Sequence, residues 1–165
     1  MKRKSVLIFI MPLLILIFSV GTAQEPAPLF KLRNLESRAS TAENRGAEKG
    51  KGGMSKNGLK GSPAIKDFRK GTTETLLDSR GPGMVRHIWC TVSQSSPVNV
   101  RNIILRMYWE NSGIPSVEVP LGDFFGMSHG ANAFVTSRLI SVQPSLGYNC
   151  DIPMPFSEHA LITVT

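Results

Sequence analysis

The sequence has 165 residues, of which 41% are apolar, and its mean hydropathy is close to zero. This composition is too apolar for a wholly disordered chain and too polar for a protein with several membrane spans. Lysine and arginine outnumber aspartate and glutamate by 19 to 12, which gives a formal net charge of +7. The length favours one domain, since domains usually contain about 100–200 residues.

Residues 1–23 have the features of a secretory signal peptide. Three basic residues at positions 2–4 precede an apolar run from 6 to 20, and small residues then supply a cleavage site before Gln24. The run is shorter than the roughly 20 residues of a spanning helix and contains Pro12. We therefore predict a secreted or periplasmic protein, with membrane contact only through an uncleaved signal peptide.

The basic charge is concentrated in one stretch. Residues 31–70 contain eleven basic and four acidic side chains, whereas 71–165 contain five and seven. The basic stretch has a single aromatic residue, Phe68, and its glycines lack the Walker spacing of a phosphate-binding loop. A nucleic-acid reader would carry its positive face on the folded domain. We predict an extended loop segment over 24–70 and no nucleic-acid partner.

The sequence from 71 to 165 is typical of short strands. Val100–Trp109 alternates between apolar and polar residues, and Met84–Val92 does so after a Gly-Pro-Gly turn signal. No segment of ten or more residues shows helical spacing. This pattern predicts an all-β, antiparallel β-sandwich or jelly roll. Five shorter strands are expected at Thr72–Leu77, Ser116–Val119, Ala133–Thr136, Leu139–Val142 and His159–Val164.

The last predicted strand, His159–Val164, stops without turn residues or a polar tail. As an edge strand it would lack the charges or prolines that normally protect an edge. We therefore expect an incomplete jelly-roll domain over 71–165, from the N-terminal part of a longer protein.

Cys90 and Cys150 are the two cysteines. A disulfide is compatible with export, and two separate thiols are the favoured alternative. Three isolated histidines and the absence of a Cys-X-X-Cys motif predict neither a metal site nor a cofactor.

Carboxylates offer one route to catalysis. A retaining glycosidase needs two carboxyl groups about 5–5.5 Å apart. Glu118 and Asp123 are close in sequence, but the sequence leaves their separation open, and solvated or capping roles are favoured for each acid. The seven acids of the predicted domain are Glu74, Asp78, Glu110, Glu118, Asp123, Asp151 and Glu158.

Five motifs, in order and spacing, resemble the N-terminal half of glycoside hydrolase family 172, first catalogued as a domain of unknown function. They are SRASTAENRGAEKGKGG at Ser37–Gly53, LLDSRGPGMVRHIW at Leu76–Trp89, LRMYWE at Leu105–Glu110, PSVEVPLGDFFG at Pro115–Gly126 and GYNCDIPMPF at Gly147–Phe156. The resemblance implies two jelly rolls per subunit, homotrimers or hexamers, and a site between subunits. It further implies retaining hydrolysis of α-D-fructofuranosides or D-arabinofuranosides by two glutamates of the second jelly roll, beyond Thr165.

On this resemblance, the chain is the first jelly roll of an exported furanosidase, inactive alone but lining part of the pocket for an oligosaccharide. The alternative is a non-catalytic carbohydrate-binding or oligomer-forming module. The matching motif makes Asp123 the first candidate for accepting a hydrogen bond from a sugar hydroxyl. The other candidates are Phe125, His129 and Trp89, together with Arg38 and Glu43 of the basic loop, which would reach a neighbouring subunit's site.

Overall fold

The computed structural model describes residues 32, 34–54, 64–93, 97–127, 129, 133–143 and 147–165, with the backbone alone at 97–99. The chain divides into two compact units, Met1–Leu35 and Glu36–Thr165. Nearly all of the first unit, including the predicted signal peptide at 1–23, lies outside the described residues. Among the described residues, no helix has both the length and the apolar character to cross a membrane. The second unit contains the strands and helices that follow.

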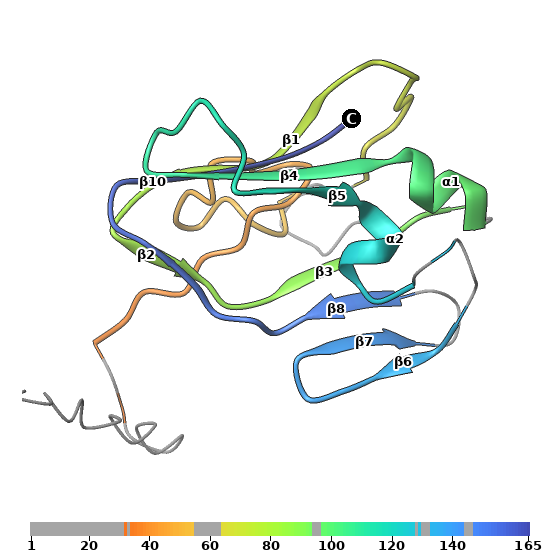
Figure 1. The fold of residues 1–165 in the computed structure, drawn as a ribbon. Coiled ribbons are helices and arrows are strands. Elements are labelled where there is room, and N and C mark those ends of the chain that lie inside the picture. The colour runs from red at the N-terminus through yellow and green to blue at the C-terminus, as the bar shows by residue number, and fades with distance from the viewer. Residues whose placement is uncertain are drawn as a thin grey trace, which may run out of the picture. The chain divides into compact units, whose positions relative to one another are not determined.

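The first sheet is antiparallel and has the strand order β1-β10-β4-β5 (Figure 1). Its strands are β1 (Glu74–Arg80), β10 (His159–Val164), β4 (Ile104–Trp109) and β5 (Val117–Pro120). β10 lies inside the sheet, with Leu161 opposite Asp78 of β1 and Tyr108 of β4. The prediction that β10 is an edge strand is therefore wrong, because both of its sides are paired.

The second sheet is also antiparallel and has the order β3-β8-β7-β6. Its strands are β3 (Ile88–Thr91), β8 (Gly147–Cys150), β7 (Ile140–Gln143) and β6 (Val135–Thr136). A two-stranded ribbon of β2 (Gly83–Val85) and β9 (Met154–Phe156) leads the chain into β3 and out of β8 (Figure 1). The predicted strand Met84–Val92 is thus interrupted between β2 and β3. The sequence does not predict β8 or β9, which are short and contain glycine or proline.

Two short helices, α1 (Pro97–Asn102) and α2 (Leu121–Phe124), lie beside the first sheet and contact each other. The predicted strand Val100–Trp109 therefore begins later, at Ile104. Val100 contributes to the core from a helix, because its side chain is buried against α2. A buried residue on a helix and one on a strand give the same apolar signal in such a short segment.

One hydrophobic core joins the inner faces of the two sheets. The first sheet contributes Leu105 and Met107 from β4 and Ile162 from β10, and the second contributes Val142 and Tyr148. The alternation predicted for β4 holds, since Leu105 and Met107 are buried while Arg106 between them is partly exposed. The prediction of an all-β antiparallel sandwich is confirmed.

The outer edge of β1 is covered by the loop that precedes it in the chain. The Asp78 amide donates to the Arg45 carbonyl at 3.0 Å, and the Ser40 hydroxyl donates to the Leu76 carbonyl. These bonds satisfy groups that an edge strand would otherwise leave free. Part of the segment predicted to be extended, 24–70, therefore belongs to the compact unit.

Both cysteines are free thiols on the inner face of the second sheet. Cys90 lies opposite Tyr148, and Cys150 lies opposite Ile88. Burial raises the pKa of Cys90 to about 12 and also raises the pKa of Cys150. Thiols in such surroundings are weak nucleophiles, since the thiolate is the reactive form.

Candidate functional site

Asp123 lies in α2 and forms an ion pair with Arg101 of α1. Arg101 Nη1 lies 2.8 Å from Asp123 Oδ2 and 3.0 Å from Oδ1. The pair is partly exposed, with 23% of the Asp123 side chain and 43% of the Arg101 side chain accessible. A carboxylate offers about four lone-pair positions, so Asp123 retains the capacity to accept hydrogen bonds from a ligand.

The local sequence explains why Asp123 meets Arg101. β5 ends at Pro120, and α2 begins at the next residue and buries Leu121 and Gly122. A Cβ on Gly122 would lie only 3.0 Å from Val100 Cγ1, so the glycine permits the close contact between the two helices. This contact brings Arg101, at the last turn of α1, beside the Asp123 carboxylate.

Phe125 lies in the core and not at the surface. Its side chain has no exposed area, and its ring lies 5.0 Å from the Phe124 ring, edge to face, and 5.4 Å from the Tyr148 ring. A ring without exposed surface cannot stack on a sugar. The structure therefore removes Phe125 from the candidate site, whereas the preceding ring, Phe124, is only partly buried.

His129 is exposed and has a backbone φ of 60°. Its neighbours Ser128 and Asn132 lie outside the described residues. The structure therefore places His129 at the surface after α2 and gives its imidazole no described partner.

Trp89 lies on β3 with 62% of its surface exposed. It faces outward from the second sheet, opposite Asn149 of β8. Asp123 instead belongs to a helix that contacts β4 and β5 of the first sheet. Among the described residues, no hydrogen bond or ion pair joins any two of the six side chains proposed from the sequence.

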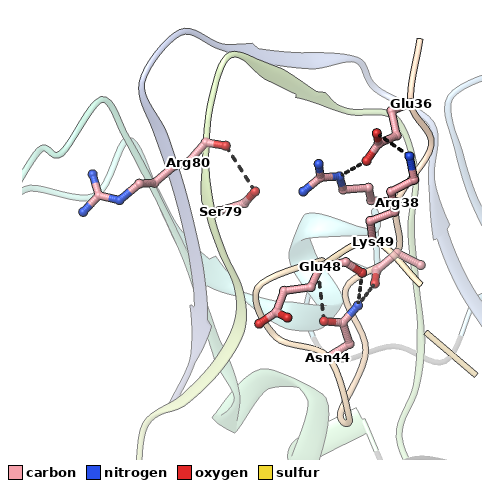
Figure 2. Close-up of polar contacts among 8 residues, drawn as sticks. Glu36, Arg38, Asn44, Glu48, Lys49, Ser79 and Arg80 are labelled. Carbon is pink, nitrogen blue, oxygen red and sulfur yellow. Dashed lines mark hydrogen bonds and ion pairs between the residues drawn. The ribbon is translucent and has the colours of Figure 1, made fainter. Parts of the chain in front are cut away.

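Arg38 is held within the loop that starts the compact unit (Figure 2). Its Nε donates to Glu36 Oε1 at 2.6 Å, and Lys49 Nζ lies 3.2 Å from Glu36 Oε2. The hydrogen bond from Lys49 and then that from Arg38 are the main causes that lower the pKa of Glu36. The loop thus neutralises part of its own positive charge.

Asn44 shapes the same loop from its buried position (Figure 2). Its Nδ2 donates to the carbonyls of Ala39 and Glu48, both at 3.1 Å, and its Oδ1 accepts from the Glu48 amide at 3.0 Å. Glu43 Oε1 accepts from the Gly53 amide at 2.9 Å, and its Oε2 is buried with no hydrogen-bond partner in the described part of the chain. Glu43 therefore also acts on the loop's conformation.

Glu110 is fixed by backbone amides, which the sequence does not predict. Its Oε1 accepts from the Ser157 amide at 2.7 Å and its Oε2 from the Glu158 amide at 2.6 Å. These bonds lower the pKa of Glu110. The positive φ of both Glu110 and Asn111 forms the turn that directs the carboxylate toward the β9–β10 connection.

Several other acids of the domain also have structural partners. Arg106 Nε lies 2.6 Å from Glu118 Oε2, so the second acid of the motif at Pro115–Gly126 is paired across β4 and β5. No hydrogen bond joins two carboxyl groups within the described ranges. The further contacts are His159 with Asp78 at 2.9 Å, Arg45 with Glu74 at 3.6 Å and Asn111 with Glu158 at 3.2 Å.

An apolar groove of about 390 Å³ opens between β4, β5 and the segment 152–155. Its seven lining residues, among them Trp109, Phe124 and Met154, are all apolar. A sugar site needs placed polar groups beside apolar surface, so this groove does not suit a sugar. The described residues also contain no group of three or more His, Cys, Asp or Glu side chains that could hold a metal ion.

Comparison with known families adds one finding. The model of a family described as GH172 domain-like matches residues 64–165, which include all ten strands and both helices described above. A search of curated proteins finds no match to the chain.

Proposed function

The chain belongs to the GH172 domain-like family, and we propose that it forms part of an exported glycoside hydrolase that acts on α-D-fructofuranosides or D-arabinofuranosides with retention of configuration. The observation that carries this proposal is the family match across the whole sandwich, 64–165. Membership relates the chain to glycoside hydrolases; the furanoside substrate and the retaining mechanism are the further steps of the proposal.

We propose that this domain binds substrate and that its own acids do not perform the catalysis. A retaining mechanism needs one carboxylate as a nucleophile and a second as an acid and base. Glu110 is held by two backbone amides, and Glu118 is paired with Arg106. The two amides stabilise the ionised form of Glu110, which makes it a poor proton donor, and the Glu118 carboxylate is already engaged by Arg106. The catalytic glutamate pair would then come from outside residues 36–165.

Asp123 is the side chain most suited to a binding role. It forms an ion pair with Arg101, is partly exposed, and is positioned by a close contact between two helices. A carboxylate held in this way can accept hydrogen bonds from sugar hydroxyls, and such charge-assisted bonds are stronger than neutral ones. His129, which follows α2 in the chain and is exposed, is the second candidate.

The test is hydrolysis of aryl α-D-arabinofuranoside and aryl α-D-fructofuranoside by the purified hydrolase of which this chain forms part, with aryl β-D-glucopyranoside as the control substrate. We expect release of the aryl alcohol from a furanoside only, and a first-formed sugar with the starting anomeric configuration in proton NMR. Asp123→Asn should raise KM, while Asp151→Asn, an exposed acid, serves as the matched control. Absence of hydrolysis of both furanosides would contradict the proposal.

A non-catalytic sugar-binding module is the second candidate function, and the structural partners of the domain's acids favour it. Such a module would bind oligosaccharides in calorimetric titrations but release no reducing sugar.

We also propose export by removal of residues 1–23 and assembly into a homotrimer or hexamer. N-terminal sequencing of the exported protein should begin at Gln24, and light scattering should report a trimer or hexamer. A retained N-terminus or a monomer would contradict the respective proposal.

A further inference from the structure

The outer face of the second sheet presents one large exposed ring above an open position. Trp89 is 62% exposed on β3. A Cβ built on Gly147 of β8 would lie 3.8 Å from Trp89 Nε1 and 3.9 Å from Gln143 Cβ of β7. The indole therefore reaches over a place on the sheet where no side chain stands, with Gln143 on the other side of it.

The strand register surrounds this ring with uncharged polar side chains. One row across the sheet runs from Trp89 through Asn149 and Ser141 to Thr136. The next row runs from Thr91 through Gly147 to Gln143. All of these residues lie on the face opposite the core, because they alternate with buried or half-buried residues such as Tyr148 and Val142.

The two rows contain no Lys, Arg, Asp or Glu. A phosphate-bearing or strongly charged partner would find no countercharge there, whereas the basic residues of the chain gather in 31–70. An exposed indole beside amide and hydroxyl groups matches a ligand with an apolar C–H face and many neutral hydroxyls. Neutral carbohydrate has this chemistry.

We propose that the outer face of the sheet β3-β8-β7-β6 binds a neutral oligosaccharide, with Trp89 stacking on a sugar ring and Asn149, Ser141 and Gln143 bonding to its hydroxyls (Figure 1 shows the four strands). This surface is separate from Asp123, whose helix contacts the first sheet. It goes beyond the proposed hydrolysis, because it would hold a chain of sugars whether or not the protein cleaves it.

The test follows tryptophan fluorescence and calorimetry during titration with arabino-oligosaccharides and inulin-type fructo-oligosaccharides. We expect a saturable fluorescence change. Trp89→Ala should raise the dissociation constant at least about tenfold, as loss of a central aromatic anchor does, and Gln143→Ala about two- to tenfold, since a hydrogen bond contributes about 0.5–1.5 kcal/mol. Ile114→Ala removes another exposed apolar side chain, from the β4–β5 connection, and this variant should bind as the unmodified protein does.

The melting temperatures of all three variants should match that of the unmodified protein, because the side chains replaced are exposed. Unchanged sugar affinity in Trp89→Ala would overturn the proposal. The proposal would also be overturned if neither type of oligosaccharide binds. This includes the case in which the protein self-associates through this face and Trp89→Ala abolishes the self-association. Binding without hydrolysis by the hydrolase of which this chain forms part would support this surface and contradict only the proposed furanosidase activity.

Discussion

Replacement of Phe125 by alanine distinguishes a core residue from a ligand contact. The Phe125 side chain is fully buried and packs against two aromatic rings, with centroids at 5.0 and 5.4 Å. Burial of such a side chain contributes about 1.5–3 kcal/mol, and each aromatic pair adds about 0.5–1.5 kcal/mol. We therefore expect Phe125→Ala to lower the free energy of unfolding by about 3–5 kcal/mol, in the range of buried Phe→Ala changes.

The assay is urea unfolding followed by circular dichroism, with Phe134→Ala as the matched control. Phe134 is 73% exposed, so its replacement should change the free energy of unfolding by less than about 0.5 kcal/mol. In a thermal scan, Phe125→Ala should lower the midpoint by on the order of 10–15 °C. A loss below about 1 kcal/mol, or one no larger than that of Phe134→Ala, would refute the assignment of Phe125 to the core.

Three further predictions concern stability and reactivity. Glu110 has a lower pKa in the folded protein than in the unfolded chain, so it stabilises the fold above the ordinary carboxyl pKa of about 4.3 and loses that contribution as the pH falls. Glu110→Gln should therefore lower the urea midpoint of unfolding at pH 7 but hardly change it at pH 3. An equal decrease of the midpoint at both pH values would contradict this prediction. Gly83→Ala would place a Cβ 2.5 Å from the Phe156 ring; a lower melting temperature is expected by calorimetry, and an unchanged one would show that the ring moves freely. Cys90 and Cys150 should not react with a disulfide reagent at pH 8 in the native protein but should give two thiols in urea, and rapid native labelling would contradict their burial.

The longer strands with clear alternation could be predicted from the sequence, whereas the short strands β8 and β9 could not. Ile104–Trp109 alternates, and it forms β4 with Leu105 and Met107 inward. Val100 continues the apolar pattern but is helical, because α1 buries it against α2. Gly147–Cys150 also alternates, but a four-residue segment that begins with glycine cannot be distinguished from a turn by its sequence.

The candidate site was less predictable, because it depends on long-range pairing. The Asp-Phe-Phe order suggests an acid with two rings at a loop, but only packing decides that Phe125 points inward. The row that joins Trp89 to Asn149 and Ser141 depends on the register of β8 with β7, which precedes it, and with β3, which lies far away in sequence. Exposed polar residues on strands carry no sequence signal of which neighbour they will meet.

The most direct test of the account measures furanoside hydrolysis after each acid of residues 71–165 is replaced by its amide. We predict that the hydrolase of which this chain forms part cleaves an aryl furanoside and that every variant retains kcat within about tenfold, because these acids hold the fold or bind substrate. The contrary result is a variant whose kcat falls about 10²–10⁴-fold, as is typical when a catalytic acid or base is missing, and recovers when azide is added. That result would place a catalytic carboxylate in this domain and contradict the account.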